Sequence, residues 1–449
     1  MRLAALGTPF VDISPLPQLA AMVCYAAIPW LLARRFNINS PLPLAMATLP
    51  IAANPYTLWN IARKFDSLPM ALSILIMILP VARGIQVNWK GRVLDVALLV
   101  CGLCFYQPSI NVYLVFLVFE LVFHQKGGID PAEFLKLALS RLTVLVAALI
   151  IYHPIDAVTV RGEYARYAGE LALGIKDIPF IVHNIYVDWN FLLNPFPREY
   201  RTLLLGTIVV GLLLITATQV RYIRCQVRLA VGRKRRLTKI AAGLLGCSLP
   251  VAWLLGSIGF LIFLRNFSPP TSYLFVGTGA LLSSVLLLVL LELREWNIDW
   301  RLQAVVLAPL AYALILFAAV YGNTLKEQKQ YEARIGARLA SDLQHLQMAN
   351  PFRVVAVSGN AGFAPIVTHV AKRFRLIRSI VEVQLAGAGN TGFFNEVLRY
   401  YGISKPAEPL NQESLEELGT VQPDVTDPSY NLYRKGDEMI VVFKPPADS

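Results

Sequence analysis

The chain has 449 residues, of which 56% are hydrophobic and only 16% charged. A soluble domain of this length does not need so much apolar surface, and several runs approach the roughly 20 residues that cross a bilayer. The formal charge of +12 is concentrated in residues 221–239, a basic loop without an acid, which marks a cytoplasmic loop of a polytopic membrane protein and excludes nucleic acid as the partner.

Ten apolar segments predict membrane-spanning helices. They cover residues 14–33, 40–53, 68–82, 92–106, 108–123, 134–152, 201–220, 241–264, 273–291 and 303–321. When residues 221–239 are cytoplasmic, each other loop on that side also carries Lys or Arg. The opposite side then receives residues 54–67, residues 153–200 and everything after residue 321. We expect any chemistry on this outer side.

The segment Asn54–Met70 combines charged and aromatic residues between two apolar runs. It is too polar for lipid and too aromatic for a plain connector, which predicts a site at the membrane surface. Asp66 is a candidate general base, because surroundings of low dielectric constant raise the pKa of a carboxyl group. Alternatively, Asp66 caps the helix that follows.

Asp12 stands just before the first predicted span and has the same two interpretations, a second carboxylate of the site or a helix cap. Arg63 and Lys64 are cations on the side where positive residues are normally depleted. This favours a bound anion such as a lipid phosphate, and the alternative is an ion pair with Asp66 or with a lipid headgroup.

A polar break near Pro108 interrupts an apolar run of more than thirty residues. Tyr106, Gln107 and Asn111 would place an aromatic ring and amides at the outer surface, where they could hold a sugar. Pro108 also has a simpler explanation, as the start of a helix after a tight turn.

After Tyr321 the composition becomes that of a soluble domain. An amphipathic helix is predicted over residues 324–348, strands over 353–358, 377–385 and 439–444, and helices over 364–373 and 393–401. Residues 405–429 are a predicted surface connection. The chain thus divides into a membrane domain, residues 1–322, and a small outer α/β domain, residues 323–449.

No metal or cofactor site is predicted. The five histidines are scattered without the spacing of metal ligands, and Cys101 and Cys104 lack a second ligand pair.

Four blocks of sequence, taken together and in order, resemble the serotype-converting glucosyltransferases that modify bacterial O-antigen. They are DISPLPQ at residues 12–18, NPYTLWN and KFDSLPM within residues 54–70, YQPSINVYL at residues 106–114, and the spaced YGN, Gln and Glu of residues 321–332. The resemblance implies a C-type glycosyltransferase of the bacterial inner membrane with about ten transmembrane helices, a periplasmic active site and a periplasmic C-terminal domain.

Such enzymes move glucose from undecaprenyl phosphate glucose to lipid-linked O-antigen, which modifies lipopolysaccharide. The implied chemistry is a metal-independent single displacement, in which a carboxylate accepts the proton of the acceptor hydroxyl and cations stabilise the departing phosphate. On this sequence the carboxylates would be Asp66 and Asp12, the phosphate partners Arg63 and Lys64, and the sugar-lining residues Tyr56, Asn60, Tyr106, Gln107 and Asn111.

One departure from the family pattern bears on these roles. Family members carry a first crossing and an acidic outer loop upstream of the DISPLPQ-like block, so we expect the start of this chain to be truncated. If that loop holds the catalytic acid, Asp12 and Asp66 play supporting roles.

Two other classes of function stay open. A transporter or flippase of a lipid-linked or anionic substrate would use Arg63 and Asp66 in a translocation path, but nearly every charge here is at the end of a span. A non-catalytic envelope scaffold would leave the cluster of Arg63, Lys64 and Asp66 unexplained.

Overall fold

The computed structural model describes residues 14–84, 88–159, 172, 174–228, 233–265, 274–386, 391–418 and 421–444. Chain contacts divide the molecule into two compact units, Met1–Ala318 and Ala319–Ser449. The predicted boundary after residue 322 lies close to this division.

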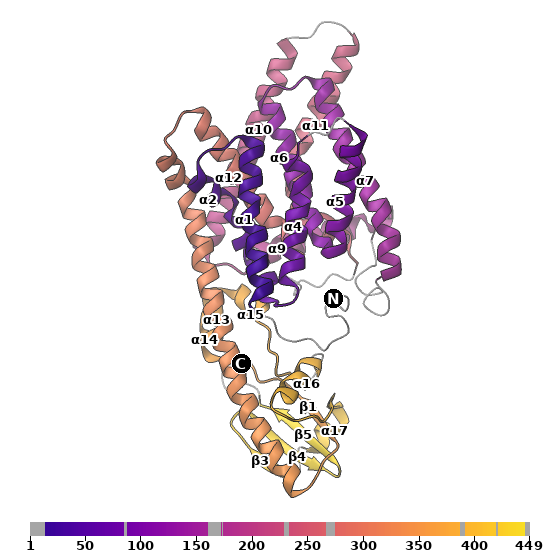
Figure 1. Ribbon diagram of the computed structural model, residues 1–449, viewed down its shortest axis with the longest axis vertical. Helices are drawn as coiled ribbons and strands as arrows, with labels where there is room; N and C mark the ends of the chain where they lie inside the picture. Colours follow the sequence, from indigo (N-terminus) through magenta and orange to yellow (C-terminus); the bar gives the residue numbers. More distant parts are fainter. Residues whose placement is uncertain are drawn as a thin grey trace. The chain divides into compact units, whose positions relative to one another are not determined.

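The first unit is helical throughout its described residues (Figure 1). Its α-helices and 3-10 helices are α1 (Leu16–Phe36), α2 (Pro41–Ala53), α3 (Pro55–Ala62), α4 (Ser67–Ala82), α5 (Trp89–Phe105), η1 (Gln107–Ser109), α6 (Ile110–Lys126), α7 (Pro131–Thr159), η2 (Ile175–Asp177), α9 (Ile178–Leu193), α10 (Arg198–Arg228), α11 (Arg233–Ile258), η3 (Gly259–Phe263), α12 (Gly277–Glu295) and the first part of α13 (Trp300–Ala349).

The protein is a polytopic membrane protein, as predicted. Each of the ten predicted spans coincides with a helix of the structure. Within the described residues, seven helices are long and apolar enough to cross a membrane, whereas the apolar helices α2 and α4 are shorter. The central part of the basic loop, residues 229–232, lies outside the described residues.

The helix α12 is the most deeply buried element of the bundle and packs against α2, α6 and α10. Small residues permit this close packing: a Cβ atom on Gly279 would lie 2.5 Å from the Pro50 carbonyl oxygen of α2. By contrast, α1 exposes a row of large apolar side chains, among them Leu19, Val23 and Trp30. Such a face is suited to lipid.

Two stretches that the hydropathy pattern assigned to outer loops are helical. The predicted loop of residues 54–67 contains α3, and the predicted loop of residues 153–200 contains the end of α7, η2 and α9. The helices α3 and α9 have apolar residues on most of their turns, but each is shorter than a membrane span.

The second unit combines the end of α13 with a mixed sheet. Its other elements are β1 (Val354–Ser358), α14 (Pro365–Arg373), α15 (Arg375–Ile380), α16 (Thr391–Tyr400), β2 (Ala407–Pro409), α17 (Gln412–Glu417), β3 (Val425–Thr426), β4 (Tyr430–Lys435) and β5 (Glu438–Phe443). The strand order is β2-β1-β5-β4-β3, with β1 parallel to both β2 and β5, and β4 antiparallel to β5.

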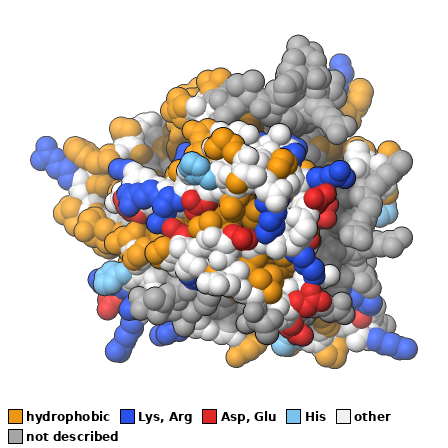
Figure 2. All heavy atoms as spheres, turned by 90° about the horizontal axis from the view of Figure 1, so that it is seen from below, with side chains coloured by type: hydrophobic (Ala, Val, Ile, Leu, Met, Phe, Trp, Pro, Cys, Tyr) orange, Lys and Arg blue, Asp and Glu red, His pale blue; other side chains and the backbone are white. Residues whose placement is uncertain are grey.

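The core of the second unit lies between the sheet and two helices. Ile335, Leu339 and Leu343 of α13 pack with the inward side chains of β1 and β5 and with Phe394 and Leu398 of α16. This confirms the predicted amphipathic stripe of residues 331–346. On the face shown in Figure 2, Lys and Arg side chains are interspersed with Asp, Glu and hydrophobic ones.

The predicted amphipathic helix of residues 324–348 is the last part of α13, which continues unbroken from Trp300 to Ala349. Two other predictions for this unit were wrong. The predicted strand of residues 377–385 is replaced by α15 and a bend, since Leu376, Ile377 and Ile380 are buried with helical spacing. The predicted connection of residues 405–429 contains β2, α17 and β3.

Candidate functional site

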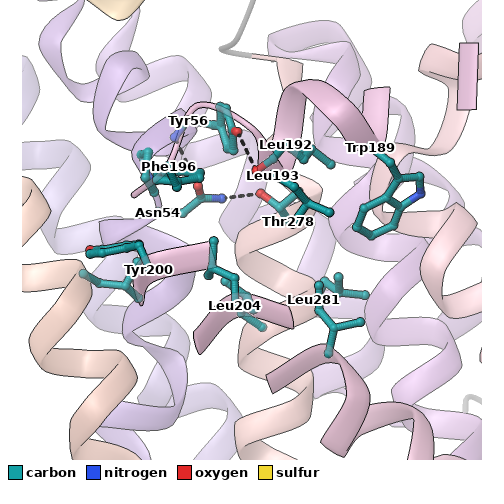
Figure 3. A pocket seen from close by; sticks show the side chains of 14 residues that line it. Asn54, Tyr56, Trp189, Leu192, Leu193, Phe196, Tyr200, Leu204, Thr278 and Leu281 are labelled. Atoms are coloured by element: carbon teal, nitrogen blue, oxygen red, sulfur yellow. Dashed lines mark hydrogen bonds between the residues drawn. The ribbon is translucent and has the colours of Figure 1, made fainter. Parts of the chain in front are cut away.

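The segment Asn54–Met70 forms the short helix α3 and a turn between α2 and α4. The Oδ1 atom of Asn54 accepts a hydrogen bond from the Tyr56 backbone N–H at 3.1 Å, and Pro55 fits the first turn because no N–H donor is needed there. The Nδ2 atom of Asn54 donates to Thr278 Oγ1 of α12 at 2.7 Å (Figure 3). One asparagine therefore begins α3 and ties it to the bundle.

Tyr56 links α3 to α9. Its side chain is buried, and its hydroxyl group lies 3.5 Å from the carbonyl oxygens of both Phe191 and Leu192. Its ring centroid lies 5.6 Å from that of Phe275. The predicted sugar-lining tyrosine is thus packed between helices, and the α9 backbone lies directly beside the predicted surface segment.

Asn60 and Tyr106, both predicted to line a sugar site, come together. Ser73 of α4 holds the break between α5 and α6, because its hydroxyl donates to the Gly102 carbonyl at 2.7 Å and lies 2.6 Å from Ser109 Oγ. Asn60 Nδ2 then lies 3.4 Å from the Tyr106 hydroxyl oxygen. The buried Asn60 Oδ1 has no hydrogen-bond partner among the described residues. It is therefore an acceptor that could take a hydrogen bond beside Tyr106.

Gln107 and Asn111 lie in different surroundings. Gln107 is exposed, and its Nε2 atom donates to the Tyr152 hydroxyl at 2.6 Å and to Asp156 Oδ1 at 2.9 Å, both on α7. Asn111 is buried and donates to the Ile258 carbonyl of α11 at 3.3 Å. The structure therefore places the two amides beside different helices.

The turn that meets Asn111 requires glycine. Gly259 has a φ of 50°, and a Cβ atom there would lie 1.8 Å from Asn111 Oδ1. The junction of α11 and η3 can approach α6 only because this side chain is absent.

The predicted charged residues lie at the end of α3 and the start of α4. Asp66 is exposed at the N-cap position of α4, and its carboxylate makes no capping hydrogen bond with the described backbone. Ser67 instead donates to the Lys64 carbonyl at 3.1 Å. The Arg63 guanidinium lies 4.8 Å from the centroid of the Trp59 ring, a cation–π contact. Asp12 lies outside the described residues.

An apolar pocket adjoins the start of α3. It is a narrow pocket with a cavity volume of ≈ 40 Å³, and it is lined by side chains of α9, α10, α12 and α13. Leu192, Leu204 and Leu281 form part of its wall, while Asn54 and Thr278 lie at its edge with their side chains hydrogen-bonded to each other (Figure 3). A pocket of this lining suits a hydrocarbon chain, with its polar end near α3.

The helix α9 also carries a buried acid, Asp188. Its side chain is 0% exposed, and neither carboxylate oxygen has a hydrogen-bond partner in the described part of the chain. Burial raises its pKa to about 7. A buried carboxylate without a partner is rare in proteins, because losing water without gaining a hydrogen bond costs free energy.

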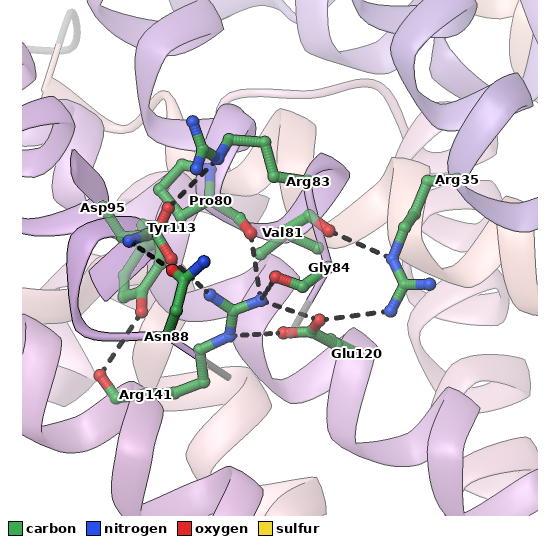
Figure 4. Close-up of polar contacts among 11 residues, drawn as sticks. Arg35, Pro80, Val81, Arg83, Gly84, Asn88, Asp95, Tyr113, Glu120 and Arg141 are labelled. Atoms are coloured by element: carbon green, nitrogen blue, oxygen red, sulfur yellow. Dashed lines mark hydrogen bonds and ion pairs between the residues drawn. The ribbon is translucent and has the colours of Figure 1, made fainter. Parts of the chain in front are cut away.

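A second polar cluster lies inside the bundle, away from α3. Arg141 of α7 donates through Nε and Nη2 to the two carboxylate oxygens of Glu120, each at 2.9 Å, and through Nη1 to Asp95 Oδ2 at 3.2 Å (Figure 4). Its Nη2 atom also donates to the carbonyl oxygens of Pro80 and Gly84 at 2.9 and 3.0 Å. This one guanidinium joins α4, α5, α6 and α7.

Arg35 extends the cluster to α1. It lies 3.4 Å from Glu120 Oε1 and donates to the Val81 carbonyl at 3.2 Å (Figure 4). Arg83 reaches Asp95 Oδ1 at 3.4 Å from the other side. We call this the Arg141 cluster. Each of its acids is paired with a guanidinium group, and the cluster holds five helices together.

Sequence reasoning did not single out Asp188 or the Arg141 cluster. The spacing of Asn184, Asp188 and Leu192 at every fourth position was a signal for the buried face of a helix. The charged residues of the Arg141 cluster lie on separate helices, so no local sequence pattern indicates that they meet. Among the described residues, no group of three or more His, Cys, Asp or Glu side chains could hold a metal ion.

Comparison with known proteins identifies the chain. No solved structure matches it. A relative from Salmonella phage P22, described as an uncharacterized 55.3 kDa protein in the gtrB 5′ region, is 28% identical over 112 residues. That match covers 25% of this chain and 23% of the relative. The family model described as glucosyl transferase GtrII matches residues 3–284. The chain therefore belongs to the GtrII glucosyl transferase family.

Proposed function

We propose that the protein transfers glucose from undecaprenyl phosphate glucose to lipid-linked O-antigen at the periplasmic face of the bacterial inner membrane. Membership of a glucosyl transferase family supports the transfer of glucose. The phage relative is named after its place beside gtrB, which fits a role in O-antigen modification. The lipid nature of the donor rests on the structure of the first unit.

The observation that carries the proposal is the apolar pocket beside α3. Its wall consists mainly of Leu and aromatic side chains, and the hydrogen-bonded pair of Asn54 and Thr278 lies where the pocket adjoins α3. A polyprenyl chain is apolar along its length and ends in a phosphate, so the chain fits the wall and the phosphate would lie toward the polar segment. A nucleotide sugar would find few polar partners in such a pocket.

The chemistry of transfer needs a proton acceptor and a partner for the leaving phosphate. Asp66 is exposed next to α3, where a hydroxyl group of an acceptor could reach it. Asp12 is the second proposed carboxylate. Arg63 and Lys64 are the proposed partners of the donor phosphate, whose negative charge grows as the sugar leaves.

The loop charges support the proposed periplasmic orientation. The loops of residues 34–39, 83–91, 124–133 and 292–302 carry Lys or Arg and join helix ends opposite to α3. Labelling tests this orientation: in a cysteine-free background, Lys64→Cys should react with a membrane-impermeant maleimide added to spheroplasts. Reaction only after lysis would place α3 in the cytosol and refute the proposal.

The activity is tested by transfer to O-antigen. The chain is expressed in a strain that makes undecaprenyl phosphate glucose, and lipopolysaccharide mass is measured. We expect the gain of one hexose per modified unit, and its loss on Asp66→Asn with membrane insertion intact. Asp299→Asn is the matched control, because Asp299 is an exposed acid at the start of a helix, α13, and binds the Arg301 N–H. Unchanged mass with the unsubstituted chain would count against the enzyme.

A transporter is the second candidate, because the Arg141 cluster puts ionisable residues inside the spans. The charges of the cluster are paired with one another, and Arg141 also donates to two backbone carbonyls, which favours a structural role over a translocation path. Reconstituted vesicles distinguish the two functions: the enzyme should consume donor only when acceptor is present, whereas a flippase should move labelled lipid between leaflets without consuming it.

A further inference from the structure

The feature that remains unexplained is the pair of free carboxylate oxygens on Asp188. The acids of the Arg141 cluster are equally buried, yet each lies beside a guanidinium. Asp188 has neither a cation nor a hydrogen-bond donor among the described residues. An ionised carboxylate can accept about four hydrogen bonds, so its capacity for partners is unused.

The neighbours of Asp188 along α9 fix its position between two contacts. One turn before it, Asn184 Nδ2 donates to the carbonyl oxygens of Ile262 and Leu264, each at 3.0 Å, at the end of η3. One turn after it, the Leu192 carbonyl meets the Tyr56 hydroxyl of α3. The carboxylate therefore lies on the buried face of α9, within about 6 Å along the helix axis of each contact.

Asp188 does not itself line the apolar pocket, but its neighbours on α9 do. Trp189, the following residue, and Leu192, on the same face of α9, both line the pocket. If the pocket holds the donor chain, the first group beyond the donor phosphate is the glucosyl unit. A hexose presents neighbouring hydroxyl groups, which are the donors that a carboxylate with two free oxygens can bind as a pair.

We propose that Asp188 binds hydroxyl groups of the glucosyl unit of the lipid donor and so determines which sugar is transferred. The inference rests on the proposed function and adds a substrate-binding residue to it. No bond is made or broken by Asp188 in this role, and the proton of the acceptor hydroxyl goes to the surface carboxylate. Because Asp188 is closed off from water, the sugar reaches it only when neighbouring side chains turn or α9 shifts.

The raised pKa is consistent with this role. Near pH 7 the carboxylate is poised between a protonated form, stable in the dry interior, and an ionised form with both oxygens ready to accept hydrogen bonds. Hydroxyl donors favour the ionised form. The donor should therefore bind more weakly as the pH falls below 7.

Binding without turnover gives the first test. Detergent-solubilised protein is titrated with undecaprenyl phosphate and with undecaprenyl phosphate glucose, and native mass spectrometry measures both affinities. We expect wild-type protein to prefer the glucosylated lipid, and Asp188→Asn to lose at least tenfold of that preference while binding undecaprenyl phosphate unchanged. Equal preference in both proteins would overturn the inference.

Deoxy donors give the second test. Wild-type protein should transfer at least one of the 2-, 3-, 4- and 6-deoxyglucosyl units roughly 100-fold less efficiently than glucose, because a buried acceptor is left unpaired. Asp188→Asn should lose that discrimination, and Asp188→Glu should restore part of it. A purely structural Asp188 would lower transfer of every donor by the same factor, which would overturn the inference.

The matched control is Asp177→Asn. Asp177 stands at the other end of α9, where it binds Arg265 at 3.0 Å and the Gly174 N–H at 2.9 Å. Its variant should keep the wild-type pattern with deoxy donors. If wild-type protein prefers the glucosylated lipid but transfers no glucose, the proposed transfer fails while the binding role of Asp188 stands. If it transfers glucose but Asp188→Asn behaves like wild type, only the inference fails.

Discussion

Asp188→Asn should make the protein more stable at neutral and alkaline pH. In the folded protein the pKa of Asp188 is raised to about 7 from its ordinary value of 3.8. The folded state therefore binds the proton more tightly than the unfolded state, and stability falls as the pH rises between these two values. The slope is about 1.4 kcal/mol per pH unit, so the full cost of ionising Asp188 is about 4 kcal/mol above pH 7. Asparagine does not ionise, so the Asp188→Asn protein does not lose this stability as the pH rises.

Thermal unfolding checks the sign and the pH window. Wild-type and Asp188→Asn proteins in one detergent are unfolded at pH values from 4 to 8, with tryptophan fluorescence as the readout. The midpoints should coincide near pH 4 and diverge up to pH 7, where the variant unfolds several degrees higher. The control Asp177→Asn should behave oppositely, because the Gly174 N–H and Arg265 lower the pKa of Asp177, and the stability that they supply is lost on acidification. A difference between wild type and Asp188→Asn that does not change with pH would refute the reasoning.

Substitutions at three further positions test other parts of the structure. Arg141→Ala leaves the buried Glu120 carboxylate without its main partner and should destabilise the protein by about 3–5 kcal/mol, measured by thermal unfolding. Arg141→Lys should recover only part of that stability, because lysine cannot donate two parallel hydrogen bonds to the carboxylate. Gly259→Ala places a Cβ atom against Asn111 Oδ1 in a backbone conformation with positive φ, so transfer activity should fall together with unfolding temperature. Leu281→Trp fills the apolar pocket and should raise the KM for the lipid donor about tenfold with little change in kcat; an unchanged KM would mean that the pocket does not hold the donor.

The membrane helices could be predicted from the sequence, because the free energy of leaving water depends on composition over about 20 residues and needs no knowledge of neighbours. The helix α9 could not. Its residues are as apolar as those of a span, but it has only 16 residues, and its burial depends on contacts with η3 and with Tyr56. In the second unit, the composition of residues 377–385 suggested a strand, whereas the burial of Leu376, Ile377 and Ile380 has the spacing of a helix.

The candidate site was predictable only in part. The resemblance pointed to Asn60 and Tyr106, and the structure brings them within hydrogen-bond distance. The packing of Tyr56 against α9 depends on residues more than 130 positions away in the chain, which no local pattern reveals. Asp188 was one polar residue among many in residues 153–200, and only its burial separates it from the solvated ones.

The Arg141 cluster bears on how the chain enters the bilayer. On leaving the translocon singly, α7 would present Arg141 to lipid, and α6 would present Glu120, each at a cost of several kcal/mol. The two charges neutralise one another only when both helices are side by side, and only four residues separate the end of α6 at Lys126 from the start of α7 at Pro131. That hairpin can partition into lipid as one unit. The helices α4 and α5 are synthesised before it, so the Pro80 carbonyl and Asp95 are already present when Arg141 enters the membrane. Synthesis order along the ribosome thus matches the order in which the ionic contacts become available.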